Sequence, residues 1–90
     1  MNFENLKLNE IDFVIKYCTI LNSWNVQNRK THIIGISYSG DELHDFGDKK
    51  FSIKENCIFF LNQKDDYSVT VNEKCLSHSI HFTTLEPIEE

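Results

Sequence analysis

The chain of 90 residues is long enough for one domain with a single modest core. Hydrophobic residues make up 40% of it and aromatic residues 12%, which is typical of a folded globule and excludes a disordered tail. The net charge of −5 is opposite in sign to that of domains that wrap nucleic acid by themselves, so DNA is not expected as a direct partner.

Three cysteines, Cys18, Cys57 and Cys75, occur in a chain whose N-terminus has neither the basic nor the apolar block of a signal peptide. An odd number of cysteines in such a chain predicts reduced, mostly buried thiols. No segment approaches the length of a membrane span. These features favour a cytoplasmic protein that does not associate with membranes.

The first element, residues 9–21, carries apolar side chains both at helical spacing and at the alternation of a strand. Its β-branched and aromatic content favours a strand. Next, "THIIGISYSG" (31–40) predicts a strand that ends in a Ser-Gly turn. Gly47-Asp48 then predicts a type II′ hairpin between residues 41–46 and 49–54, with Asp45 opposite Lys50.

Three more strands are expected before Pro87 ends the regular structure. "CIFFLN" (57–62) follows Glu55-Asn56, where Asn tolerates the left-handed conformation of a tight turn. "DYSVTVN" alternates, with Tyr67, Val69 and Val71 on one face. "CLSHSIHFTT" (75–84) closes the sheet. The spacing of the turns predicts an all-β antiparallel sandwich or small barrel.

The ordered segments "SWNVQNRKTHIIGISYSG", "DFGDKKFSIKENCIFFLNQKDDYSV" and "SHSIHF" resemble the N-terminal cupin domain of AraC-type transcriptional regulators, a domain like the arabinose-binding one. The resemblance covers residues 22–84. It implies a cupin-type antiparallel double-stranded β-helix, a jelly-roll barrel, over residues 11–84, with an N-terminal arm over 1–10 and a tail over 85–90. Two turns depart from the family: 54–56 replaces its Pro-Gly-Asp, and 62–66 lacks the loop histidine that contacts ligand in relatives.

The function implied by this resemblance is the effector-binding and dimerisation half of a regulator. Such a half senses a small molecule, for which a sugar is one candidate, and forms a homodimer. It acts on DNA only through a helix-turn-helix region that has no counterpart in these 90 residues. Two alternatives stay open: a stand-alone small cupin enzyme or sugar-binding protein, and a purely structural dimerisation module with a filled barrel.

No metal, cofactor or catalytic residue is expected. Metal-binding cupins need two histidines one residue apart, whereas the corresponding strand offers His32 alone. Cys75, His78 and His81 do not make a second metal site, because strand positions three apart point to opposite faces. "SYSGD" is not a nucleophile elbow. An enzyme is therefore the minority hypothesis.

Five residues are predicted to bind the ligand: Trp24, Arg29, Tyr67, Ser79 and His81. The family resemblance implies that Arg29 grips an oxygen-rich ligand, a role that suits guanidinium. Each residue also has a simpler role. Arg29 suits a solvated loop charge, Trp24 a plug of the barrel, Tyr67 a phenol anchored on a backbone carbonyl, and His81 a satisfied core histidine. His44 and His78 are assigned to the surface.

Overall fold

A computed structural model describes residues 7–19 and 21–85. These residues contain no helix and form six strands: β1 (Leu8–Cys18), β2 (Ser23–Val26), β3 (His32–Asp45), β4 (Lys50–Lys54), β5 (Cys57–Leu61) and β6 (Tyr67–Thr84). The prediction of an all-β antiparallel fold is confirmed, and so is the choice of a strand for the first element. No helix that could cross a membrane occurs in the described part of the chain.

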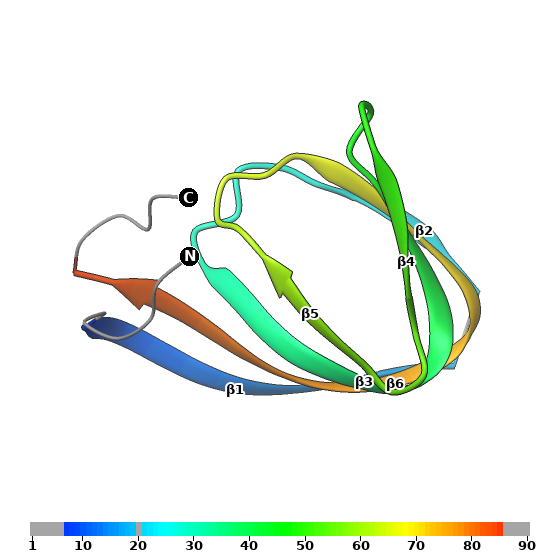
Figure 1. Ribbon diagram of the computed structural model, residues 1–90, viewed down its shortest axis with the longest axis horizontal. Coiled ribbons are helices and arrows are strands. Elements are labelled where there is room, and N and C mark those ends of the chain that lie inside the picture. Colours follow the sequence, from blue (N-terminus) through cyan, green and yellow to red (C-terminus); the bar gives the residue numbers. More distant parts are fainter. Residues whose placement is uncertain (1–6, 20, 86–90) are drawn as a thin grey trace.

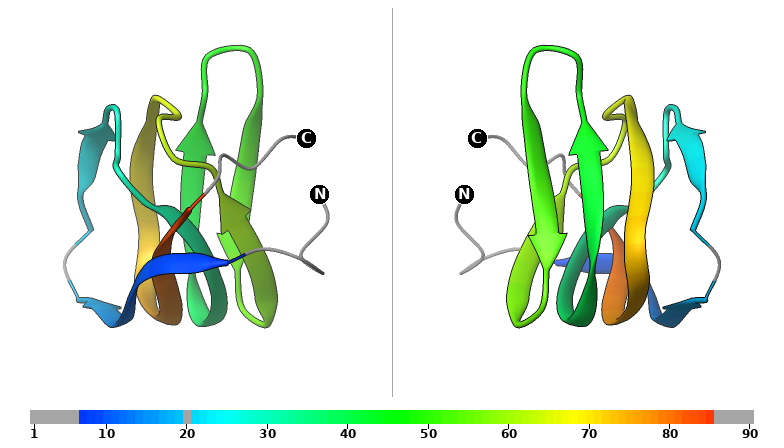
Figure 2. Two further views of the ribbon diagram at one scale, coloured as in Figure 1. Left: turned by 90° about the vertical axis from the view of Figure 1, so that its left-hand side faces the viewer. Right: turned by 90° about the vertical axis from the view of Figure 1, so that its right-hand side faces the viewer.

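Two long, bent strands, β3 and β6, build the barrel (Figure 1). They pair with each other along most of their length. The first half of β3 and the second half of β6 are flanked by β5 and β1, while their other halves are flanked by β4 and β2. Figure 2 shows the second group side by side, in the order β4, β3, β6, β2. The bends in β3 and β6 therefore turn one sheet back over itself.

The Ser-Gly turn predicted after "THIIGISYSG" is wrong, because β3 continues through Gly40 to Asp45. The pairing of β3 with β6 shifts register between Ser37 and Glu42, and Gly40 lies in this bulge with φ of +102°. A β-bulge bends a strand and increases its twist, which lets β3 turn from one half of the barrel into the other. β6 is likewise one strand where two were expected.

The hairpin between β3 and β4 matches its prediction. Asp45 pairs with Lys50, and their charged groups lie 3.7 Å apart. Gly47 has φ of +91° and Asp48 does not have a positive φ, which is the type II′ pattern. Asn56, in the turn before β5, adopts the left-handed conformation with φ of 59°. At these two turns, the residue types alone predicted the backbone conformation correctly.

The ends of the chain are described only in part. Residues 1–6 of the predicted arm and 86–90 of the predicted tail, with Pro87, lie outside the described residues. Leu8 to Glu10, also assigned to the arm, belong to β1. β1 and the last part of β6 run together away from the barrel (Figure 1).

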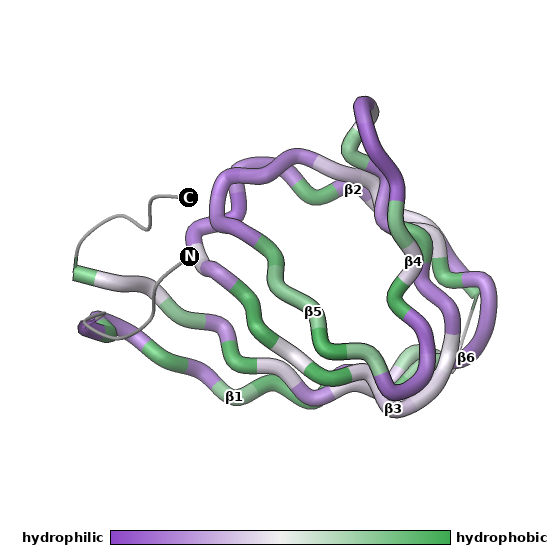
Figure 3. Tube along the Cα trace, in the orientation of Figure 1, coloured by the Kyte–Doolittle hydropathy of each residue, from purple (hydrophilic) through white to green (hydrophobic). Residues whose placement is uncertain are grey.

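The two faces of the β1–β6–β3–β5 half differ in their surroundings. The inner face looks into the barrel, where Ile33, Leu61, Tyr67 and Val69 form the buried core. The outer face carries exposed apolar side chains. Figure 3 shows hydrophobic residues running along β5 and the adjoining part of β3. A strand with one solvated face alternates in polarity, so these runs indicate that both faces of this sheet are apolar.

Candidate ligand-binding site

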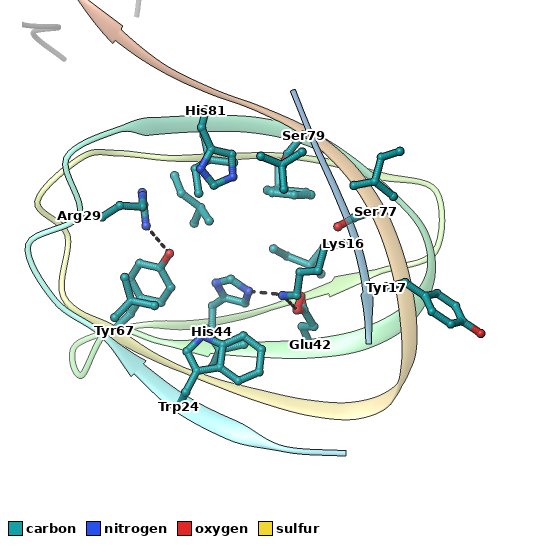
Figure 4. A pocket seen from close by; sticks show the side chains of 18 residues that line it. Lys16, Tyr17, Trp24, Arg29, Glu42, His44, Tyr67, Ser77, Ser79 and His81 are labelled. Carbon is teal, nitrogen blue, oxygen red and sulfur yellow. Dashed lines mark hydrogen bonds and ion pairs between the residues drawn. The ribbon is translucent and has the colours of Figure 1, made fainter. Parts of the chain in front are cut away.

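A cavity of about 540 Å³ lies inside the barrel, and all six strands contribute to its walls. The five residues predicted to bind a ligand, Trp24, Arg29, Tyr67, Ser79 and His81, all line it (Figure 4). They come from β2, β6 and the segment before β3, so only closure of the barrel brings them together. The interior of the barrel is therefore not filled by its own side chains. This argues against the alternative of a purely structural dimerisation module with a filled barrel.

Arg29 is half-buried at one end of the cavity, and its guanidinium is not a solvated loop charge. Its Nε donates to the Thr31 carbonyl oxygen at 2.9 Å and its Nη2 to the Asn62 carbonyl oxygen at 2.7 Å. Its Nη1 donates to the Tyr67 hydroxyl. These partners are neutral, and no carboxylate among the described residues forms an ion pair with Arg29. Its positive charge is therefore uncompensated by a neighbouring anion.

Tyr67 is buried at the start of β6, and its phenol meets Arg29, not the backbone carbonyl considered above. Burial raises the pKa of Tyr67, although Arg29 acts in the opposite direction. The phenol therefore stays protonated in the neutral range. Trp24 stands on β2 against the same space, with the Lys16 ammonium 4.7 Å from its ring centroid.

Several cavity residues escaped the sequence analysis, among them Lys16, Glu42 and His44. Lys16 forms an ion pair with Glu42, whose second oxygen lies 3.1 Å from the ammonium nitrogen. Glu42 is only 7% exposed. Burial, the strongest influence, would raise its pKa, but His44 and Lys16 beside it more than offset this, and the pKa of Glu42 falls below its ordinary value. The carboxylate is therefore charged at neutral pH and neutralises Lys16.

The assignment of His44 to the surface is wrong, because its side chain is 4% exposed and lines the cavity. Its ring stacks between Phe51 and Tyr67, with centroid distances of 5.4 and 5.3 Å. Its Nε2 lies 4.0 Å from Glu42, beyond hydrogen-bonding distance, and neither ring nitrogen has a hydrogen-bond partner. His44 is therefore a buried lining residue without a hydrogen bond of its own, with Glu42 as its nearest charged neighbour. His78 is exposed, as expected.

A signal for the buried position of His44 and Glu42 was present in the hairpin. With Asp45 opposite Lys50, His44 pairs with Phe51 and Glu42 with Ile53. Residues paired across antiparallel strands share a face, and Phe51 and Ile53 are the apolar residues of β4. The register predicted from Gly47-Asp48 therefore already placed both polar residues on the buried face.

His81 lies at the Arg29 end of the cavity on β6. Burial, followed by the charge of Arg29, lowers the pKa of His81 below its ordinary value of 6.5, while Asp12 acts weakly in the opposite direction. The imidazole is therefore neutral at neutral pH. It joins Ser79, two positions before it on the same face of the strand, in offering neutral polar groups to the cavity.

The lowered pKa of His81 predicts a pH dependence of stability. The imidazole of His81 binds a proton more tightly in the unfolded chain than in the folded protein. The contribution of neutral His81 to the free energy of unfolding is therefore complete above its ordinary pKa, and it is lost as the pH falls through the lowered pKa of the folded protein. We expect the free energy of unfolding, measured with urea, to fall between about pH 7.5 and 5.5 less steeply in H81Q than in the unaltered protein. Equal slopes would contradict this. The lowered pKa of Glu42 acts only in more acidic solution.

The described residues contain no cluster of three or more histidine, cysteine or acidic side chains that could hold a metal ion. No disulfide joins the three cysteines, and only Cys75 is buried, while Cys18 and Cys57 are half-buried, so the expectation of mostly buried thiols is wrong. Burial raises the pKa of Cys75, which keeps this thiol protonated and unreactive.

No protein-family model matches the sequence, and no curated protein matches it either. Solved structures do resemble it. A cupin-2 domain containing protein from Shewanella frigidimarina aligns with a TM-score of 0.67 and 11% identity, over 92% of this chain and 84% of that one. A protein from Neisseria meningitidis gives a TM-score of 0.67 and 11% identity, over 92% and 88%. Likenesses at this identity show the fold alone, and the chain has the cupin fold.

Proposed function

We propose that the chain binds a small, hydroxyl-rich metabolite carrying one negative charge inside the cavity. The observation that carries the proposal is His44, a buried residue that lines the cavity, makes no hydrogen bond through either ring nitrogen, and has Glu42 4.0 Å from its Nε2. Buried polar atoms in folded proteins are nearly always hydrogen-bonded, and an unsatisfied one costs about 1–3 kcal/mol. A ligand hydroxyl can both donate and accept, so it suits either nitrogen of a neutral imidazole.

The size and wall chemistry support a ligand of sugar-like dimensions. A volume of about 540 Å³ lies within the usual range for small-molecule sites, about 300–1,000 Å³. Ser77, Ser79 and His81 line one side, and the ring of Trp24 lines another. Polar groups set among apolar walls fix the orientation of a ligand, while the apolar surface supplies much of the affinity.

The charge of the ligand follows from the cavity's ionic groups. Lys16 and Glu42 neutralise each other, which leaves Arg29 as the unbalanced charge among the lining residues. A carboxylate on the ligand would gain a charge-assisted hydrogen bond from a guanidinium that is already held in place by Thr31 and Asn62. A sugar acid or a similar hydroxy acid combines both features.

We further propose that this binding serves sensing, in the manner of the AraC-type regulators that the sequence resembles. The ordered motifs over residues 22–84 and the cupin fold support this proposal. In that role the ligand would favour one arrangement of the protein over another by about 1–3 kcal/mol. Contact with DNA would be made by a separate helix-turn-helix region.

Fluorescence of Trp24, the single tryptophan, provides the test. The purified protein is titrated with matched pairs of compounds, each an aldose and its aldonic or uronic acid. We expect a saturable change with at least one acid and weaker binding of its neutral partner. Equal binding within every pair would contradict the proposed negative charge of the ligand but would support the binding of a small molecule. Silence across all pairs would contradict the binding itself, and a stoichiometric transition metal found by elemental analysis would favour the cupin enzyme.

A further inference from the structure

The outer side of the β1–β6–β3–β5 sheet carries a continuous surface, here called the outer apolar face. Its members are Phe13, Ile15, Ile34, Ile36, Ile58, Phe60, His78 and Ile80. The strand register arranges them in two rows that cross all four strands. One row runs Phe13, Ile80, Ile34, Phe60, and the other runs Ile15, His78, Ile36, Ile58.

This face is exposed and uncharged. Phe13 is 79% exposed, Ile58 77% and Ile15 69%, and a groove of about 570 Å³ runs along the face. None of the eight residues is Lys, Arg, Asp or Glu, although charged residues make up 26% of the chain. Soluble monomers rarely expose apolar patches of more than a few hundred Å². The composition of this face therefore indicates that another surface covers it.

We propose that the outer apolar face is the interface through which two copies of this chain associate around a two-fold axis. The area fits this occupant. With Ile11, Tyr17 and Tyr38 at its margins, the face exposes roughly 900 Å² of side chain, close to the ~800 Å² per partner of a standard interface. A two-fold interface places each patch against itself. An uncharged face meets itself without bringing like charges together, although each copy carries a net charge of −5.

The interface does not depend on the proposed ligand, yet β1 belongs to both sites. Phe13 borders the outer groove and Lys16 the cavity, while Val14 and Ile15 between them border both spaces. Alternate residues of a strand point to opposite faces of the sheet. A second copy packed against the outer side of β1 would therefore also fix the position of the β1 side chains that line the cavity. The proposed interface would place the dimer implied by the resemblance to regulators on this sheet.

Sedimentation velocity over a range of protein concentrations tests the interface. We expect the unaltered chain to be a dimer at about 50 μM, and I58E to weaken association at least about 30-fold, the effect of losing a large apolar contact and burying a charge. Ile58 is 77% exposed, so the substitution does not disturb the core. S52E, at an exposed position of β4, adds the same charge away from the face and serves as the matched control.

The outcomes separate cleanly. A dimer that dissociates in I58E and persists in S52E supports the proposal. A monomeric unaltered chain at that concentration, or an I58E dimer as tight as that of S52E, would overturn it. F13E, at the most exposed position of the same face on β1, repeats the test if I58E loses its far-ultraviolet circular dichroism spectrum.

Discussion

Replacing Gly40 with alanine should lower the free energy of unfolding by about 3 kcal/mol or more, a large part of the roughly 5–15 kcal/mol that stabilises a small domain. Gly40 has φ of +102°, where a side chain strains the backbone by about 1–3 kcal/mol. A β-carbon there would also lie 2.4 Å from the β-carbon of Cys75 and 2.7 Å from the carbonyl oxygen of Lys74. Backbone atoms of β6 cannot move aside without disturbing the pairing of the two longest strands. Urea denaturation measures the change.

Gly47 provides the matched control for Gly40. Its φ is +91°, but a β-carbon added there would meet nothing within 4 Å. G47A therefore carries the backbone strain without the clash, and we expect a loss of about 1 kcal/mol. The difference between the two variants isolates the close approach of β3 to β6 at the bulge. Equal losses would contradict the view that this approach, and not φ alone, requires glycine at position 40.

Gly40 also shows where prediction from the sequence fails. The pair Ser39-Gly40 indicated a turn because glycine serves turns and bulges equally well. The choice between them depends on Cys75 and Lys74, which lie across the sheet and more than thirty positions away in the sequence. Local patterns do not contain that information. Where both partners were local, as in the hairpin of Asp45 and Lys50, the prediction was confirmed.

The residues of the cavity show the same difference between what local and distant parts of the sequence determine. Trp24, Arg29, Tyr67, Ser79 and His81 were chosen one strand at a time, and the structure places all five around one space. Whether they bind ligand stays a prediction. Arg29 has a structural role that its neighbours in sequence did not reveal, because its acceptor at Asn62 comes from a distant loop.

Polar residues on strands were the main source of error. His44 was assigned to the surface, and Glu42 was given no role. Both are buried and line the cavity, because the barrel interior is a space lined partly with polar groups and not a uniform apolar core. Lys16 was missed for the same reason, since its ion pair with Glu42 forms only when β1 reaches the bend of β3.

Replacing His44 with phenylalanine should have opposite effects on stability and on binding. The imidazole already stacks on Phe51 and Tyr67 at interplanar angles of 17° and 23°, so a phenyl ring fits the same slot. The change removes two buried nitrogens that have no hydrogen-bond partner. Replacing an unsatisfied polar group by an apolar group of similar shape is neutral or stabilising. Glu42 loses one of the two neighbours that lower its pKa but keeps its ion pair with Lys16, so we expect a gain of at most about 1 kcal/mol in unfolding free energy.

The same variant should weaken binding of whichever sugar acid binds in the Trp24 titration by at least about tenfold, the loss of one or two hydrogen bonds in a desolvated site. H44Q keeps a donor and an acceptor and should retain more of the affinity while gaining less stability. These changes in stability and affinity are expected only if His44 lowers the stability of the fold but contacts the ligand, a combination that is common in functional sites. If H44F lost stability and kept its affinity, His44 would be a core residue and the argument for a ligand hydroxyl beside it would fail.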